Sequence, residues 1–424
     1  MSLLQREQLT GPAVAPPKAR NAGSSPPIAA ALLTGGSDRP YVFGLTTSLM
    51  CRCAALDLIG SDELDFPEFH SMAGLNFLKL RGSQSQDAGF VRKLLRVSLY
   101  YARLIRYAAT GKPKLFHILW NNRFETFDRT LLMCYYKLLR KKVALTAHNI
   151  NAAKRDGSDT RLNRLTLRIQ YRLADHIFVH TEPMKGQLSE DFGVHEDRVT
   201  VIPFGINNAV PVTHLTPADA RRRLGIREGE RTILFFGRIT PYKGLEYLIA
   251  AFRQIAAGRN DYRLIVAGRP DRCEEYWKGI QREIREEVAS GRVLLNAQFI
   301  PDNETEVYFK AADVLVLPYR SIYQSGVLFL AHSFGLPVIA TDVGSLKDDV
   351  VDGKTGYIVK PEDSVELAGA IERYFRSELY AHLDTHRREI KEYAAARHSW
   401  DTVGEMTLDV YARLLQSPGA GPRS

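Results

Sequence analysis

Cysteine is scarce in this chain, with four residues among 424. Cys51 and Cys53 form a Cys-x-Cys pair, a spacing found in neither zinc ribbons nor thioredoxin-type redox motifs, and Cys134 and Cys273 lie far apart in the sequence. The cysteine content therefore excludes a disulfide scaffold, and it favours reduced thiols over a metal or redox site.

Long hydrophobic runs are also missing. No stretch of about 18 consecutive apolar residues occurs, which predicts that no helix spans a membrane. The N-terminus lacks the succession of charged, apolar and small residues that is typical of a secretory signal. We therefore expect a cytoplasmic protein.

The common nucleotide-binding motifs are absent as well. Gly35–Gly36 follows a predicted strand, but no Gly-x-Gly-x-x-Gly is present there. Gly353–Lys354–Thr355 resembles the end of a P-loop, but Asp348 stands where the first glycine of that motif is required. These departures argue against a dinucleotide-dependent oxidoreductase and against a P-loop NTPase.

Positive charge is what the chain has in excess. Lys and Arg number 57 against 48 Asp and Glu, which gives a net charge of +9. Such a surplus favours anionic partners, among them phosphate-bearing ligands, nucleic acid and acidic lipid. Because no nucleic-acid-binding motif is present, we expect no nucleic-acid partner.

The length and the hydrophobic pattern predict two α/β domains, because single hydrophobic cores stop growing at roughly 250–300 residues. Residues 1–26 are Pro-rich and without periodicity, which predicts a disordered tail. From Ile28 onward, short apolar runs alternate with segments of helical period. This alternation predicts two Rossmann-like, doubly wound domains that face each other across a cleft, over residues 27–210 and 211–398. A C-terminal helix at 399–416 either completes the second domain or crosses back to the first.

The predicted strands of the first domain are Ile28–Leu33, Ala54–Ile59, Asn76–Leu80, Lys114–Trp120, Val143–His148, His176–His180 and Val199–Pro203. Those of the second domain are Thr232–Phe236, Arg263–Ala267, Val293–Leu295, Val314–Leu317 and Pro337–Thr341. Amphipathic helices are predicted at Phe90–Ala109, Phe124–Arg140, Arg161–Ala174, Leu245–Ala257 and Glu274–Val288.

Two cations follow the first predicted strand of the second domain. Arg238 and Lys243 lie five residues apart on the strand-to-helix turn, where they are expected to point into the cleft. There Arg can bind a diphosphate bidentately, and Lys acts as a mobile point charge. In the first domain, Gly35–Gly36 precedes a helix whose N-terminal N–H groups suit a phosphate, although a plain tight turn is the alternative.

Several histidines lie in or at the ends of predicted strands. His148 ends a strongly apolar strand and is followed by Asn149, so both are expected at the cleft, with a structural histidine as the alternative. For His117 and His180 we favour a structural role.

The predicted helix Phe90–Ala109 is both basic and amphipathic. Such a helix can lie on an anionic membrane, and the same composition fits a helix with one buried and one solvated face, which we favour. Its cations are Arg92, Lys93, Arg96, Arg103 and Arg106.

The cationic turn is also where the chain resembles a known family. Phe236–Gly237–Arg238 with Lys243–Gly244–Leu245 is similar to the phosphate-binding motif of retaining family 4 glycosyltransferases, also called glycosyl transferases group 1. Further similar segments follow in the family's order, and the resemblance covers residues 28–415. These segments are Gly35–Gly36, His148, Val201–Gly205, Ala311–Pro318, Gly335–Gly344 and Asp352–Tyr357.

The resemblance implies the GT-B fold and a nucleotide diphosphate sugar as donor substrate, with no cofactor. It assigns Arg238 and Lys243 to the β-phosphate, with His148 near the donor sugar. No Asp-x-Asp is present, so we expect a site without metal. Donor contacts are expected from Gly35, Gly36, Gln324, Ser325, Gly326, Phe299 and Ile300, and acceptor-side contacts from Asp38 and Asn149.

The chain departs from the family at one place. Many members carry two glutamates just before the Gly-x-Pro-Val segment, where Ile322 and Leu330 stand here. We expect a retaining hexosyltransferase that acts on a glycan or lipid-linked acceptor in polysaccharide or exopolysaccharide synthesis, with possible peripheral contact to anionic membrane. A sugar-nucleotide-binding partner or regulator without activity, and a GT-B-fold epimerase, are the alternatives.

Overall fold

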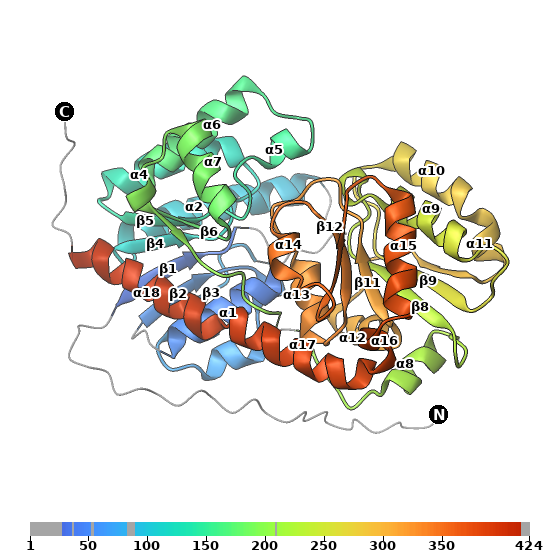
Figure 1. Cartoon of the computed structure of the whole chain (residues 1–424). Helices are drawn as coiled ribbons and strands as arrows, with labels where there is room; N and C mark the ends of the chain where they lie inside the picture. Colours follow the sequence, from blue (N-terminus) through green and yellow to red (C-terminus); the bar gives the residue numbers. More distant parts are fainter. Residues whose placement is uncertain (1–27, 36–37, 52–54, 83–89, 208–209, 417–424) are drawn as a thin grey trace, which may run out of the picture.

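The structure is a computed structural model that describes residues 28–416 except 36–37, 52–54, 83–89 and 208–209, so the tail predicted at 1–26 lies outside the described residues. Two parallel sheets, each flanked by helices, make up the two halves of the molecule (Figure 1). The predicted α/β architecture of two doubly wound domains is therefore confirmed.

The first sheet has seven parallel strands in the order β3-β2-β1-β4-β5-β6-β7. Within it, β1 pairs with β2 and β4, so that Leu33 lies beside Ile59 and Ile118. The strands are β1 Ala29–Leu33, β2 Ala55–Ile59, β3 Leu75–Leu78, β4 Leu115–Ile118, β5 Lys142–Thr146, β6 His176–Val179 and β7 Val199–Val201.

Apolar helix faces cover both sides of this sheet and bury its central strands, as a parallel sheet requires. The helices whose residues build the core on one side are α2 Phe90–Thr110, α4 Met133–Leu138, α6 Arg161–Leu173 and α7 Glu182–Phe192. On the other side lie α1 Arg39–Met50 and the C-terminal α18 Trp400–Gln416. Two short helices, α3 Glu125–Phe127 and α5 Ala152–Arg155, complete this half.

The second sheet has six parallel strands in the order β10-β9-β8-β11-β12-β13, the doubly wound arrangement. The strands are β8 Arg231–Phe236, β9 Tyr262–Ala267, β10 Val293–Asn296, β11 Val314–Leu317, β12 Val338–Thr341 and β13 Gly356–Val359. The helices are α8 Pro217–Arg223, α9 Leu245–Ile255, α10 Glu274–Glu283, α11 Arg285–Ala289, α12 Asp302–Ala311, α13 Gly326–Ser333, α14 Leu346–Asp349, α15 Ser364–Phe375, α16 Glu378–Ala381 and α17 Leu383–Arg397.

Helix α18 lies against α1 of the first half, after α17 has ended beside the second sheet (Figure 1). Trp400, its first residue, packs where only glycines leave room, because a Cβ on Gly44 or on Gly205 would lie 2.0 or 2.2 Å from the indole. Its Nε1 donates a 2.7 Å hydrogen bond to the carbonyl of Ile206, and its own carbonyl accepts one of 2.6 Å from Ser48. This indole therefore joins the C-terminal helix to the first half.

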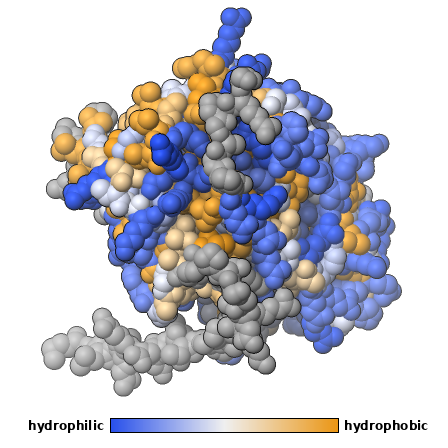
Figure 2. Space-filling model, turned by 90° about the vertical axis from the view of Figure 1, so that its left-hand side faces the viewer, coloured by the Kyte–Doolittle hydropathy of each residue, from blue (hydrophilic) through white to orange (hydrophobic). Residues whose placement is uncertain are grey.

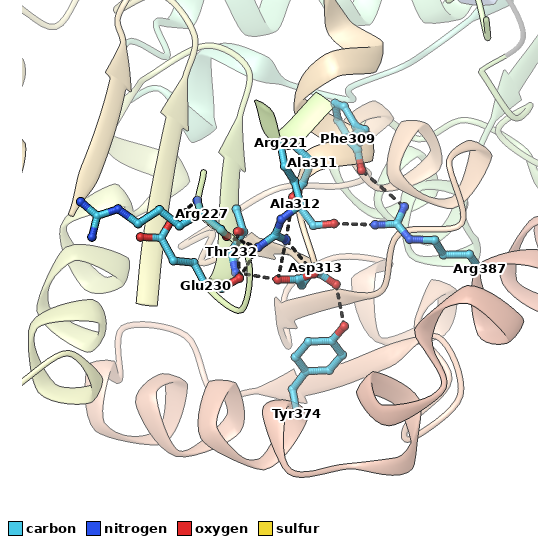
Figure 3. A network of polar contacts seen from close by, with 10 residues as sticks. All are labelled: Arg221, Arg227, Glu230, Thr232, Phe309, Ala311, Ala312, Asp313, Tyr374 and Arg387. Carbon is cyan, nitrogen blue, oxygen red and sulfur yellow. Dashed lines mark hydrogen bonds and ion pairs between the residues drawn. The ribbon is translucent and has the colours of Figure 1, made fainter. Parts of the chain in front are cut away.

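A buried polar network holds the amino-terminal edge of the second sheet (Figure 3). Asp313, before β11, accepts a 2.7 Å hydrogen bond from the backbone of Thr232 and pairs with Arg221 at 3.3 Å. Arg387 donates to carbonyls at the ends of α12 and α13, including those of Phe309 and Phe334. Because ligands of such sheets bind at the carboxyl ends of the strands, these charged residues serve the fold.

None of the helices described by the structure is long and apolar enough to cross a lipid bilayer.

Candidate functional site

The turn after β8 folds back, so that Lys243, which the sequence predicts at the diphosphate, lies beneath the end of the strand. Gly237 has φ +100° and Gly244 has φ +64°, backbone conformations that glycine adopts at little cost. A Cβ on Gly237 would lie 3.0 Å from the Nζ of Lys243, and one on Gly244 would lie 2.1 Å from the carbonyl oxygen of Pro318. Both glycines are thus required for the lysine to fold inward.

Lys243 is buried, with only 6% of its surface exposed. Its Nζ lies 5.3 Å from the centroid of the Tyr319 ring, and no carboxylate pairs with it among the described residues. Burial, followed by the nearby charges of Arg238 and Arg155, lowers the pKa of Lys243 from 10.5 to about 7. A buried ammonium group without a counter-ion is a favourable place for an anion to bind.

Arg238 stands at the surface beside this lysine. Its Nη1 lies 3.2 Å from Oδ2 of Asp271, and 66% of its side chain is exposed. Its charge also acts on the pKa of Lys243 and on that of Asp38 in the first half, so the predicted pair does lie together, next to the other half.

Arg155 is a third cation at this place, and sequence reasoning missed it. It ends α5 in the first half, and its guanidinium lies 4.4 Å from the ring centroid of Tyr242, the residue before Lys243. It pairs with its neighbour Asp156 through Nε at 2.7 Å. No spacing in the sequence relates residue 155 to residue 243, because only the facing of the two halves brings them together.

The predicted glycine turn lies on the first half, at the same interface. Gly35 has φ +52°, and a Cβ there would lie 1.8 Å from the carbonyl oxygen of Trp120. Gly36 lies outside the described residues. Asp38 caps α1 by accepting a 3.2 Å hydrogen bond from the backbone of Tyr41, and burial raises the pKa of its carboxyl group. Next to it, Arg39 reaches Asp302 of the second half at 3.5 Å.

His148 lies just past β5, at the carboxyl edge of the first sheet. The indole of Trp120 stacks on its ring at 4.1 Å with an interplanar angle of 5°, and its Nδ1 lies 3.0 Å from Nε2 of His180. Burial, together with the neighbouring His180 and His117, lowers the pKa of His148 well below 6.5, so its imidazole is neutral at pH 7. Asn149 follows it, half-buried.

The predicted donor loop precedes α13. Ser325 is buried at the N-cap of α13 without a capping hydrogen bond from its side chain, and the Oε1 of Gln324 is buried without a partner among the described residues. Gly326 begins the helix, and a Cβ there would meet nothing closer than 4.0 Å. The Oε1 of Gln324 therefore lacks a partner among the described residues, whereas the Oγ of Ser325 lies 3.5 Å from the hydroxyl oxygen of Tyr319.

The two positions where family members carry glutamate are filled here by apolar residues. Leu330 is buried in the core beside β11 and β12, and Ile322 packs against the same core. Tyr323, next to Ile322, donates a 2.5 Å hydrogen bond to Gln187 of the first half. These two positions therefore serve packing, and their neighbour tethers the loop to the other half.

Phe299 and Ile300, predicted at the nucleobase, behave differently. Phe299 is 69% exposed just beyond β10, where an aromatic ring is free to stack on a base. Ile300 is buried in the core, so its side chain faces the protein interior. Within the described part of the chain, no group of three or more His, Cys, Asp or Glu side chains could hold a metal ion.

Two family models match this chain, one in each half. The family model for Glycosyltransferase Family 4 matches residues 74–210, and that for Glycosyl transferases group 1 matches residues 218–397. The chain is 29% identical over 261 residues to D-inositol 3-phosphate glycosyltransferase of Corynebacterium urealyticum, covering 59% of each chain. It is 32% identical to the Nocardia farcinica protein of the same name, over 57% of this chain and 53% of that one. The first three curated relatives are spanned over 54–60% of their length.

Solved structures share the whole fold. Sucrose-phosphate synthase from Thermosynechococcus elongatus superposes with a TM-score of 0.71 at 22% identity, over 92% of this chain and 99% of that one. Anabaena HepE in complex with UDP-glucose superposes with a TM-score of 0.69 at 17% identity, over 91% and 99%. At these identities the likeness shows a common fold, and it confirms the GT-B prediction.

Proposed function

Because this chain belongs to the glycosyl transferases group 1 family, we propose that it transfers a sugar from a nucleotide diphosphate sugar to a glycan or lipid-linked acceptor. The observation that carries the proposal is the buried ammonium of Lys243, which has no carboxylate partner among the described residues and is flanked by Arg238 and Arg155. A departing diphosphate is the anion that this arrangement suits.

The cations supply the electrostatic work of the transfer. As the glycosidic bond breaks, negative charge develops on the β-phosphate oxygens, and preorganised positive charge stabilises it without a metal ion. Lys243 supplies a desolvated charge from beneath, while Arg238 and Arg155 reach the diphosphate from the two halves. Ser325 and the N–H groups that begin α13 bind further donor oxygens, and Gln324 accepts a hydrogen bond from a sugar hydroxyl through its unpartnered Oε1.

The sugar then lies against the carboxyl edge of the first sheet, where His148 binds one of its hydroxyl groups. Asp38 orients the acceptor hydroxyl from the start of α1, and Phe299 stacks on the nucleobase. We propose retention of the anomeric configuration, by attack on the face from which the diphosphate departs, as the family resemblance implies.

A panel of sugar nucleotides tests the proposal. The full chain is incubated with UDP-, GDP-, ADP- and dTDP-sugars, and both free nucleoside diphosphate and the fate of the sugar are measured. Release of one diphosphate with transfer to a glycan or lipid-linked acceptor supports the proposal. Release with an inverted free sugar points to an epimerase, and the absence of any turnover overturns the transferase.

A binder without activity is the second candidate, because Ile322 and Leu330 replace two carboxylates of the family. Such a protein would bind one sugar nucleotide and act as a partner or regulator in polysaccharide synthesis. Thermal unfolding in the presence of UDP, GDP, ADP and dTDP separates the outcomes, because a large shift with one diphosphate but no turnover is expected only of the binder.

Nucleoside diphosphate binding should weaken as the pH rises above about 7, the lowered pKa of Lys243. Below that pH the ammonium is already charged, whereas above it the free protein must take up a proton to bind. The dissociation constant of the best diphosphate, measured by titration calorimetry, should then rise up to about ten-fold per pH unit. The Lys243→Met variant should lose this dependence, and an unchanged slope in that variant would contradict the assignment.

The outer face of the first half suits peripheral binding to an anionic membrane. Helices α2, α4 and α6 contain no acidic residue, and Figure 2 shows hydrophobic residues gathered in the upper part of this face beside hydrophilic ones. Leucine side chains and basic residues that face solvent together favour an acidic lipid surface. The leucines that face solvent are Leu94, Leu95, Leu99, Leu138, Leu162 and Leu165.

We expect the full chain to sediment with vesicles that contain phosphatidylglycerol and to stay free of vesicles of phosphatidylcholine alone. Replacing Leu95 and Leu99 with serine should lower the bound fraction several-fold, because each removes apolar area from the lipid contact. Val365→Ser, an equally exposed apolar position on the second half, is the control. Equal binding to both vesicle types would exclude the anionic surface.

A further inference from the structure

Two histidines at the carboxyl edge of the first sheet form a hydrogen-bond chain whose direction is fixed. The Nδ1 of His180 lies 3.3 Å from the carbonyl oxygen of Ile202, and its Nε2 lies 3.0 Å from Nδ1 of His148. A carbonyl oxygen only accepts hydrogen bonds, so His180 carries its hydrogen on Nδ1. Burial lowers the pKa of His180 to about 4 and that of His148 well below 6.5, so each ring carries one hydrogen at pH 7.

The position of the hydrogen on His148 follows from this. With its hydrogen on Nδ1, His180 has a lone pair on Nε2, and the contact with His148 requires a donor on the other side. His148 therefore carries its hydrogen on Nδ1, and its Nε2 has a lone pair. The structure leaves this Nε2 buried and without a partner among the described residues.

Packing prevents the His148 ring from turning to another arrangement. Trp120 stacks flat on one face, and the ring of Tyr41 meets His148 edge-on at 4.7 Å with an interplanar angle of 87°. A buried acceptor that lacks a donor costs about 1–3 kcal/mol, so it is a group that a ligand can satisfy. Among the described residues, the groups that act on the charge of His148 are His180 and His117, both neutral, and no carboxylate does so.

We propose that His180 is a positioning residue that fixes His148 as the Nδ1–H tautomer, so that His148 Nε2 accepts a hydrogen from a hydroxyl group of the bound sugar. The inference rests on the proposed function, since it takes the ligand to be a sugar nucleotide. A hydroxyl group supplies the hydrogen that the lone pair needs. A deoxy position supplies none, and the lone pairs of a carboxylate would face that of Nε2. The site should therefore select a sugar with a free hydroxyl over the matching deoxy sugar or uronate.

The tautomer is tested without turnover, by nitrogen NMR of the full chain labelled with 15N-histidine. We expect His148 to show a protonated Nδ1 and an unprotonated Nε2, with its signals identified by their loss in His148→Asn. In His180→Phe, which keeps the ring but removes the acceptor, His148 should move toward the Nε2–H form. His180→Gln, which offers an amide oxygen instead, should restore the Nδ1–H form. A protonated Nε2 in the unmodified chain overturns the proposal.

Ligand selection is tested with the sugar nucleotide of the panel that is bound best and with its analogues that each lack one hydroxyl group. The Nε2 signal of His148 should shift when the hydroxylated sugar binds, and stay in place when the analogue that lacks the contacting hydroxyl binds. His180→Phe should lower the preference for the hydroxylated sugar about ten-fold, the loss expected for one hydrogen bond. His176→Phe, at the opposite end of β6, is the control and should keep the preference. Equal shifts with the sugar and with every deoxy analogue overturn the hydroxyl contact, whereas a missing transfer reaction affects only the proposed function.

Discussion

Lys243→Met should lower kcat/KM for the sugar nucleotide by about 10²–10³-fold, the effect of removing one preorganised charge from a developing anion. The same variant should unfold at a higher temperature at pH 7. Burial lowers the pKa of Lys243 to about 7, whereas the unfolded chain keeps this side chain charged up to pH 10.5. Burying the charged side chain at pH 7 therefore lowers the free energy of unfolding, and methionine removes that cost. This destabilisation by the uncompensated charge is present below pH 7 and decreases as the pH rises toward 10.5.

Measured together, activity and stability identify a functional residue. If Lys243 merely supported the fold, its replacement would lower both the stability and the activity of the protein. Initial rates and thermal unfolding are measured on the same preparations. Lys278→Met provides the control, because Lys278 is exposed and its partner among the described residues is the nearby Glu275 at 2.7 Å, so neither quantity should change. Full activity in Lys243→Met would remove this residue from the reaction.

Trp400→Ala should lower the free energy of unfolding of the first half by about 3–5 kcal/mol, the usual cost of deleting a large buried aromatic residue. The indole fills space left by Gly44 and Gly205 and donates its N–H to Ile206, so its loss leaves both a cavity and an unpaired carbonyl. Equilibrium unfolding in urea, followed by circular dichroism, measures the loss.

Trp277→Ala is the matched control for this change. Trp277 is only partly buried against the core of the second half, so its replacement should cost less and should leave the first half unaffected. If the two variants lost equal stability, the docking of α18 through Trp400 would not be a main support of the first half.

The sheets could be predicted because parallel strands buried on both faces are continuous apolar runs. The predicted run Val143–His148 corresponds to β5, Lys142–Thr146, and Val314–Leu317 matches β11 residue for residue. Strand β13, Gly356–Val359, was missed as a strand. It begins with a glycine, which weakens a strand pattern, whereas the equally short β11 is apolar at every position.

The candidate site could be predicted only where its residues lie close together in the sequence. Arg238 and Lys243 share one turn, and their spacing indicated a phosphate site. The burial of Lys243 depends on the two glycine conformations of its turn, and the approach of Arg155 depends on how the halves meet. Ile300 shows the opposite case, since its side chain is buried in the core although it directly follows the exposed Phe299.

The chain passes between its two halves twice, and both passages run side by side. The backbone N–H of Ile206 donates to the carbonyl of His398 at 2.9 Å, and the Nδ1 of His398 lies 3.1 Å from the carbonyl of Phe204. A rotation about this common line preserves these bonds, whereas a sliding movement would break them. Figure 1 shows α5 at the opposite edge of the contact between the halves. A rotation that opened the molecule about this line would therefore separate Arg155 from Tyr242, and the distance between these two side chains would measure the opening.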